Sequence, residues 1–200
     1  MSIADDPLPL PIDVRPGRDV VRQGDVDPGA WIVRSGALFL ESVDPEGRRL
    51  VLDVLGPGDL VGGLPGVPAE ASARAVLGSR LVPAGPAALR DGLARRARRA
   101  ARIAVTLAWD RVPQRIAVRM DDLATRFGRP VPGGLRIDLP LSHDDIAGLT
   151  GTTRESVSRS LARLARSGRI AGGRGSYVVR PGPADDYPPD WSSASEHDGQ

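Results

Sequence analysis

Polar side chains that can bond to the edges of nucleic-acid bases are concentrated in one short stretch of the chain. Arg154, Glu155, Ser158 and Arg159 fall within six residues. An arginine can donate two parallel hydrogen bonds to O6 and N7 of guanine, and a carboxylate can accept one from N4 of cytosine. These residue types at this spacing indicate contacts to bases in the major groove of DNA.

Two helices joined by a sharp turn are predicted around this stretch. Ser142 suits the N-cap of the first helix, and Asp144 and Asp145 lie in its first turn, where the positive helix end favours acids. Gly151 follows where the chain must reverse, because glycine adopts left-handed backbone geometry without a steric cost. The buried stripe of the second helix is predicted from residues at i, i+4 and i+7, which are Val157, Leu161 and Leu164.

Glu155 has two interpretations. Thr152 and Glu155 have the spacing of a T-x-x-E capping box, which alone would account for the glutamate. The second helix could equally be an amphipathic surface helix whose arginines are only solvated. The preceding helix, the glycine turn and a following hairpin favour DNA binding. Phosphate contacts are expected from Ser142 and Thr153, because hydroxyls and free N–H groups at helix N-termini bind phosphate oxygens.

A hairpin rich in glycine follows the second helix. Gly168 is expected to end the helix, and short strands are predicted at residues 169–171 and 176–179. Residues 172–175 form the turn between these strands and carry little side chain that could obstruct a phosphate backbone. Arg174 at the tip is predicted to contact phosphate, with plain exposure to solvent as the alternative. The whole pattern predicts a winged helix-turn-helix.

This pattern resembles the DNA-binding half of the Crp/Fnr family of bacterial transcription regulators. The sequence from Arg154 to Arg159 is similar to the family's R-E-T-V-x-R recognition helix. Residues 145–147 with Gly151 resemble the preceding helix and turn, and residues 115–117 resemble the R-I-A that opens the family's first DNA-domain helix. The resemblance covers residues 111–180.

The resemblance assigns roles to these residues. It implies that Arg154, Glu155 and Arg159 contact bases and that Ser142 and Thr153 hold phosphates. It also implies a sequence-specific regulator of double-stranded DNA that acts as a homodimer on an inverted repeat, and an activator that contacts RNA polymerase. A protein that binds nucleic acid without sequence preference is the rival interpretation.

Composition and charge agree with DNA binding. Residues 111–180 hold 13 arginines and 6 acids, a net charge of +7, whereas residues 1–86 have a net charge of −4. Positive charge is therefore concentrated where phosphate neutralisation requires it. The 200 residues include no cysteine, which excludes disulfides and cysteine-ligated iron–sulfur clusters. No spacing of an acid, a histidine and a nucleophile indicates catalysis, so we expect no enzyme, no cofactor and no metal site.

The two ends of the chain and its hydropathy indicate a cytoplasmic protein. The first residues are acidic and interrupted by proline, unlike a signal peptide. No apolar run is long enough to span a membrane. The last segment, residues 181–200, contains five acids and no basic residue, and it is predicted to be a disordered tail.

An all-β roll is predicted over residues 1–85. Short apolar runs alternate with glycine, proline and aspartate turns, and the runs lie at residues 19–21, 30–33, 37–40, 50–55 and 79–82. Residues 44–47 have the composition of a hairpin turn. This layout resembles the cyclic-nucleotide-binding β-roll of the same family. The predicted fold class is α+β, with an N-terminal cyclic-nucleotide-binding-like β-roll, a long dimerisation helix and a C-terminal winged helix-turn-helix.

The nucleotide-binding residues of that family are missing. Its pattern is a Gly-Glu pair followed by an Arg-Ser/Thr-Ala, in which the glutamate binds the ribose and the arginine neutralises the cyclic phosphate. The corresponding positions are Gly63 and Ala71, and Arg74 is displaced by three residues. We therefore predict that the roll does not bind cyclic AMP. The alternative is a roll that senses an unidentified small molecule.

A long helix is predicted over residues 86–110. One set of residues approximates the 4-3-4-3 spacing of a coiled-coil seam, and these are Leu93, Ala97, Ala100, Ala104 and Leu107. In the family such a helix pairs with its twin along a two-fold axis, and the alternative is a helix packed only on its own roll. The basic run between residues 95 and 102 is interpreted as a solvated face.

The remaining elements of the DNA-binding domain follow this helix. A helix is predicted over residues 113–127, with one apolar face formed by Ile116, Met120, Leu123 and Phe127. Residues 127–134 are predicted to be a loop. Residues 135–139 are predicted to be a strand that pairs toward the wing.

Overall fold

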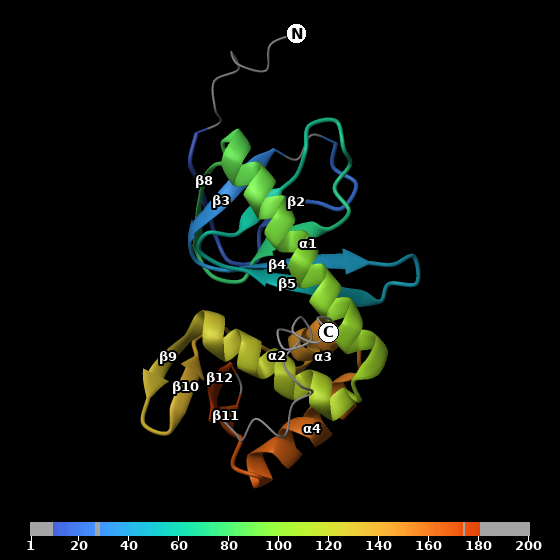
Figure 1. Ribbon diagram of the computed structural model, residues 1–200, viewed down its shortest axis with the longest axis vertical. Helices are drawn as coiled ribbons and strands as arrows, with labels where there is room; N and C mark the ends of the chain where they lie inside the picture. Colours follow the sequence, from blue (N-terminus) through green and yellow to red (C-terminus); the bar gives the residue numbers. More distant parts are fainter. Residues whose placement is uncertain (1–9, 27–28, 174, 181–200) are drawn as a thin grey trace, which may run out of the picture.

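The molecule consists of an N-terminal β-roll, a long connecting helix and a C-terminal helical domain that carries a small sheet. The computed structural model describes residues 10–26, 29–173 and 175–180. In Figure 1 the roll lies above the C-terminal domain, and the long helix runs down beside both. Arg174 and residues 181–200, for which a phosphate contact and disorder are predicted, lie outside the described residues.

Two four-stranded antiparallel sheets form the roll. Their orders are β1-β8-β3-β6 and β2-β7-β4-β5. The strands are β1 Ile12–Val14, β2 Asp19–Val21, β3 Ala30–Ser35, β4 Leu38–Val43, β5 Arg49–Leu55, β6 Leu60–Gly62, β7 Ser72–Ala75 and β8 Ser79–Pro83. The five runs predicted as strands correspond to β2, β3, β4, β5 and β8, so the predicted roll is confirmed. The short strands β1, β6 and β7 were not predicted.

The hairpin turn predicted at residues 44–47 joins β4 to β5. The backbone N–H of Gly47 donates to the carbonyl of Asp44 at 2.9 Å, and the Asp44 carboxylate accepts from the Arg48 N–H at 2.8 Å. Gly47 has a φ of 81°, which suits only glycine without strain. The roll's interior is aliphatic, and Leu38 and Leu81 are completely buried there. These apolar side chains stabilise the two sheets against each other.

The described part of the C-terminal half contains four helices and a four-stranded sheet. The helices are α1 Pro86–Trp109, α2 Val112–Phe127, α3 His143–Thr150 and α4 Arg154–Arg166. The strands are β9 Gly128–Val131, β10 Gly134–Ile137, β11 Ile170–Gly173 and β12 Ser176–Val179, in the order β11-β12-β10-β9. The predicted helices at residues 86–110 and 113–127 are confirmed as α1 and α2. The strand predicted from residue 135 is β10, and it pairs with β12 of the wing as expected.

The loop predicted at residues 127–134 is wrong, because Gly128–Val131 forms strand β9. Prolines suggested a loop, but β9 is an edge strand, where a proline removes no ladder hydrogen bond. Pro130 pairs with Leu135 across the hairpin. Gly133 has a φ of 85° and allows the tight reversal between the two strands.

One hydrophobic core joins the roll to the C-terminal domain. Phe39 and Val51 of the roll belong to the same buried cluster as Ile116 and Met120 of α2. Helix α3 lies against β5 so closely that a Cβ added to Gly148 would come within 3.0 Å of a methyl carbon of Val51. The first helix of the predicted helix-turn-helix is therefore docked on the roll.

Buried ion pairs reinforce this junction. Arg49 of β5 contacts Glu41 at 2.6 Å and Asp145 of α3 at 3.0 Å. Glu41 is 9% exposed, so these charges compensate one another away from solvent. The Arg49–Asp145 pair ties the roll to α3 directly.

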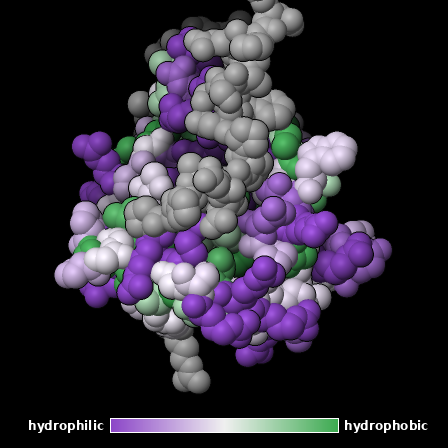
Figure 2. All heavy atoms as spheres, turned by 60° about the horizontal axis from the view of Figure 1, so that its bottom comes forward, coloured by the Kyte–Doolittle hydropathy of each residue, from purple (hydrophilic) through white to green (hydrophobic). Residues whose placement is uncertain are grey.

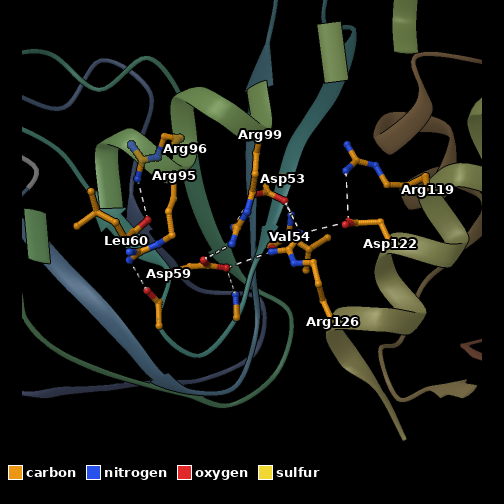
Figure 3. A network of polar contacts seen from close by, with 12 residues as sticks. Asp53, Val54, Asp59, Leu60, Arg95, Arg96, Arg99, Arg119, Asp122 and Arg126 are labelled. Atoms are coloured by element: carbon orange, nitrogen blue, oxygen red, sulfur yellow. Dashed lines mark hydrogen bonds and ion pairs between the residues drawn. The ribbon is translucent and has the colours of Figure 1, made fainter. Parts of the chain in front are cut away.

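A second ionic cluster lies where β5, α1 and α2 meet. Arg99 of α1 contacts Asp53 at 3.1 Å and Asp59 at 2.7 Å. Arg126 of α2 reaches the same two aspartates at 2.9 and 3.1 Å. Figure 3 shows the two guanidinium groups converging on the carboxylates from opposite sides. The interpretation of residues 95–102 as a solvated face is therefore wrong for Arg99, whose carboxylate partners are both buried. It is also wrong for Arg96, which is half-buried and donates to two backbone carbonyls of the roll.

Candidate nucleic-acid interface

Helices α3 and α4 are joined by the predicted turn. The Ser142 hydroxyl accepts a hydrogen bond from the Asp145 N–H at 3.1 Å, and the Asp145 carboxylate accepts one from the Ser142 N–H at 3.0 Å. This reciprocal pair is a capping box. Gly151 ends α3 in the left-handed region, with φ 57° and ψ 48°. The predicted cap and the predicted glycine turn are both confirmed.

The capping box predicted between Thr152 and Glu155 is wrong. Thr153 is the N-cap of α4, and its hydroxyl accepts from the Ser156 N–H at 3.3 Å. Thr152 instead completes the end of α3, because its N–H donates to the carbonyl of Ala147 at 3.1 Å. Because Thr152 and Thr153 are adjacent and both can cap a helix, the sequence alone does not show which of them is the N-cap of α4. A capping box therefore does not account for Glu155.

Glu155 is an exposed carboxylate at the start of α4. Its oxygens accept hydrogen bonds from its own N–H and from the Thr153 hydroxyl, which hold the pKa of Glu155 below its ordinary value. The positive end of the helix also favours an acid at this position. Glu155 is therefore ionised near neutral pH and can accept a hydrogen bond from a base.

The outward face of α4 carries the predicted base-contacting side chains. Val157 is completely buried and Leu161 is 7% exposed, while Leu164 packs against the same cluster, so the apolar stripe faces the domain. The four predicted residues are all exposed, and they are Arg154, Glu155, Ser158 and Arg159. Helix α4 lies at the lower end of the molecule in Figure 1, which Figure 2 turns toward the viewer. Hydrophilic side chains gather over the lower part of that face (Figure 2).

The polar contacts of this face are exposed and easily exchanged. Ser158 Oγ lies 2.8 Å from Nδ1 of His143 and donates to the Arg154 carbonyl at 3.0 Å. Arg159 donates to Ser156 Oγ at 3.1 Å. Exposed polar contacts of this kind contribute little to stability. These side chains can therefore exchange their present contacts for contacts to DNA at a small cost in free energy. His143 was missed by the sequence analysis, although its place directly after the Ser142 cap was a usable signal.

The predicted phosphate-contacting residues lie at two neighbouring helix starts. Ser142 precedes α3 and Thr153 precedes α4, and both are exposed. A hollow of about 490 Å³ joins these starts to the wing, with Ser142, Arg154 and Gly175 among its walls. The wing itself is the predicted hairpin, formed by β11 and β12. The wing and both helix N-termini thus lie around one concave surface.

Helix α1 presents two different faces. Of the predicted seam, Ala97, Ala100 and Ala104 are exposed, whereas Leu93 and Leu107 are half-buried. Leu107 packs toward α3, where a Cβ on Gly151 would lie 3.2 Å from its methyl carbon. The exposed apolar stripe comprises Ala94, Ala97, Ala101, Ala104, Val105 and Ala108.

None of the helices in the described ranges is long and apolar enough to cross a membrane.

The position of the missing nucleotide-binding arginine is apolar. Ala71 is 8% exposed and belongs to the core of the roll. Arg74 points to the other side of β7, where it contacts Glu41 at 2.9 Å and lies over the Phe39 ring. Arg74 therefore does not supply the positive charge that the family's arginine would provide at the position of Ala71.

Helix α1 lies tightly against the strand that precedes this segment. Arg96 donates to the carbonyls of Leu60 and Gly62 at 2.7 and 3.0 Å. A Cβ added to Gly92 would come within 2.6 Å of the Leu60 side chain. Arg96 thus holds the end of β6 against α1 (Figure 3).

Comparison with known proteins agrees with this geometry. Residues 11–96 match the cyclic nucleotide-binding domain, and residues 114–181 match the Crp-like helix-turn-helix domain. The CRP-like cAMP-activated global transcriptional regulator of Mycobacterium tuberculosis strain H37Rv is 33% identical, over 80% of this chain and 79% of that protein. The nitrogen fixation regulation protein FixK of Rhizobium meliloti is 30% identical, over 78% of this chain and 76% of that protein.

Solved structures show the same architecture. A CRP/FNR-family transcriptional regulator from Thermus thermophilus superposes with a TM-score of 0.75 at 28% identity, covering 86% of this chain and 93% of that chain. The α+β fold, the helix-turn-helix and the sequence relatives all lead to one assignment. The chain belongs to the Crp/Fnr family of DNA-binding transcription regulators.

Proposed function

We propose that this regulator binds an inverted-repeat operator as a homodimer, with α4 of each copy in a major groove. The observation that carries the proposal is the exposed strip of Arg154, Glu155, Ser158 and Arg159, backed by the buried side chain of Val157. Two such helices related by a two-fold axis would reach successive major grooves about 34 Å apart. Ser142, Thr153 and Arg174 would contact phosphates.

Family membership supports the finer parts of the proposal. It favours an activator that contacts RNA polymerase, a cytoplasmic location and a role without catalysis. The basic residues 111–180 supply the charge for phosphate contacts.

Selection of bound duplexes from a randomised pool tests sequence-specific binding. The full chain is expected to enrich an inverted repeat, whose affinity is then measured against random duplex over a salt series. A specific site should remain at least about 10³-fold tighter than random DNA. Affinity equal for all duplexes would instead support a protein that binds nucleic acid without sequence preference.

Replacing Ala101 by glutamate is expected to convert the homodimer to monomer. Ala101 is in the middle of the exposed apolar stripe of α1, so two carboxylates would face each other across the two-fold axis. Light scattering after size-exclusion chromatography measures the mass. Ala100→Glu is the comparison variant, because Ala100 belongs to the seam predicted from the sequence, whereas Ala101 lies in the middle of the exposed stripe. Dissociation by Ala100→Glu but not by Ala101→Glu would contradict this choice of seam.

Cyclic AMP is expected neither to bind the full chain nor to alter its affinity for the selected operator. The reason is the absence of a cation at Ala71, since a buried phosphate without a positive partner costs several kcal/mol. Isothermal titration calorimetry with cyclic AMP checks binding, and the operator titration is repeated with the nucleotide present. A Kd below about 1 mM would contradict the prediction.

A further inference from the structure

A cavity of about 240 Å³ lies where the roll, the long helix and the DNA-binding domain meet. Its walls come from β5, α1, α2 and α3, and it is separate from the segment between β6 and β7 that replaces the nucleotide-binding residues. Five arginines line it against two aspartates, so its formal charge is +3. Ile103, Val118 and Leu149 add an apolar wall. The cavity combines cations with an apolar surface.

Two of the five arginines are already neutralised. Arg99 and Arg126 share Asp53, at 3.1 and 2.9 Å, and both also pair with Asp59 just outside the cavity, at 2.7 and 3.1 Å. Arg126 also contacts Asp122 at 3.3 Å. Arg102 is exposed at the rim and has no ion pair with any described residue. The excess positive charge is therefore carried by Arg102 of α1 and by Arg115 and Arg119 of α2.

Arg115 is half-buried and Arg119 is largely buried, and both have poor partners. The Arg119 side chain is 10% exposed, its closest carboxylate is Asp122 at 3.8 Å, and it donates to the Leu149 carbonyl at 3.4 Å. Burial lowers the pKa of Arg119. The Nη1 of Arg115 donates to the Leu107 carbonyl at 3.4 Å, but its buried Nε has no hydrogen-bond partner among the described residues. Figure 3 shows Arg119 beside Asp122 and apart from the paired arginines. Buried cationic donors are costly unless an anion compensates them.

We propose that this cavity binds a small organic anion, with a carboxylate or phosphate group at Arg115 and Arg119 and a short apolar part against Ile103 and Val118. Guanidinium groups match both oxyanions through paired hydrogen bonds. The volume lies below the 300–1,000 Å³ range of drug-sized ligands, which restricts the ligand to a small metabolite.

Such a ligand would act as an effector of DNA binding. It touches α2 and α3 of the DNA-binding domain as well as Asp53 of the roll, so its affinity depends on how the two are docked. A ligand that binds one docked arrangement more tightly shifts the population toward it. This coupling rests on the proposed function, whereas the binding itself does not.

Calorimetric titration of the full chain without DNA tests the site, with inorganic phosphate, glycerol 3-phosphate and succinate as probes. We expect at least one organic probe to bind with a Kd below about 1 mM and more tightly than inorganic phosphate. Phosphate and carboxylate headgroups are distinguished by which organic probe binds. Failure of both organic probes to bind would overturn the proposal, as would tighter binding of inorganic phosphate.

Three arginine variants make the test specific. Arg119→Gln is expected to weaken binding about tenfold or more, because it removes a charged donor to the anionic group. Arg102→Gln is expected to weaken binding as well, because it removes a positive charge from the rim of the same cavity. Arg34→Gln is the matched control, since Arg34 is exposed on β3 away from the cavity, and its affinity should equal that of the parent. If Arg119→Gln fails to fold, the affinity of the rim variant Arg102→Gln shows whether the probe binds in this cavity. Equal affinity in Arg102→Gln and Arg34→Gln would overturn the site.

Repeating the operator titration with the bound probe separates the two proposals. A changed operator affinity supports coupling, and an unchanged affinity overturns it while the anion site stands. A chain that binds the probe but no duplex would refute the proposed function and leave the cavity assignment intact.

Discussion

Arg159→Ala is expected to weaken binding to the selected operator by about 5- to 150-fold, which corresponds to about 1–3 kcal/mol. Arg159 is exposed on the outward face of α4, and among the described residues its guanidinium donates to the Ser156 hydroxyl alone, at 3.1 Å. Loss of a paired contact to guanine should also relax the preference at one position in each half-site. Fluorescence anisotropy with the operator and its single base-pair substitutions measures both effects.

Arg163→Ala is the matched control for this prediction. It removes the same charge from an exposed position on the same helix, one turn further from the N-terminus. Arg163 lies outside the predicted reading strip, so we expect it to contact phosphate at most. Because a phosphate contact carries no base preference, the affinities of Arg163→Ala for operator and random duplexes should change by the same factor. Arg154→Ala should behave like Arg159→Ala. If Arg159→Ala kept the base preference of the parent, α4 would not be the reading element.

Asp59→Ala is expected to lower the free energy of unfolding by about 3–5 kcal/mol. Asp59 is 7% exposed and accepts from Arg99 at 2.7 Å, Arg126 at 3.1 Å and the Gly56 N–H at 2.9 Å. Removing Asp59 leaves the positive charges of Arg99 and Arg126, at the junction of the roll, α1 and α2, with one shared carboxylate fewer. Urea unfolding of parent and variant measures the difference.

An exposed ion pair provides the control. Asp13→Ala removes a carboxylate that is 75% exposed and 3.2 Å from Arg80, so its effect should stay below about 1 kcal/mol. A loss for Asp59→Ala no larger than that for Asp13→Ala would show that the buried cluster does not stabilise the junction.

The effect of Asp59→Ala should also depend on pH. Burial raises the pKa of Asp59, but the hydrogen bonds and positive charges of Arg99 and Arg126 outweigh it and hold the pKa below the ordinary 3.8. The stabilisation is therefore complete above pH 3.8 and is lost as the pH falls through the lower value in the folded state. The difference between parent and variant should shrink below that pH. A constant difference would contradict the assignment.

Local patterns predicted the DNA-binding half well. The Ser142 cap, the Gly151 turn and the Val157 stripe depend on residues close in sequence, and the structure confirms them. The N-cap of α4 was assigned to the wrong residue because two adjacent residues fit the capping pattern equally well. Thr152 and Thr153 could both cap α4, and only the hydrogen bond of Thr152 back to Ala147 decides between them.

Contacts between residues far apart in the sequence could not be predicted from local patterns. Arg49 and Asp145 are 96 residues apart, and Arg126 and Asp59 are 67 apart. Nothing near Arg99 in the sequence indicates that α1 turns it toward two buried aspartates. The same holds for α1: the 4-3-4-3 spacing predicted a seam that includes Leu93 and Leu107, and it gave no sign that both would be half-buried within the same chain.

Methylation interference on the selected operator tests the central claim that exposed side chains of α4 contact base edges in two successive major grooves. Guanine N7 lies in the major groove and adenine N3 in the minor groove, so methylation at each atom reports a different groove. Two clusters of N7 interference about 10 base pairs apart are expected, and interference at one position in each cluster should disappear in Arg159→Ala. Interference confined to adenine N3, or N7 methylation without effect on binding, would contradict that claim.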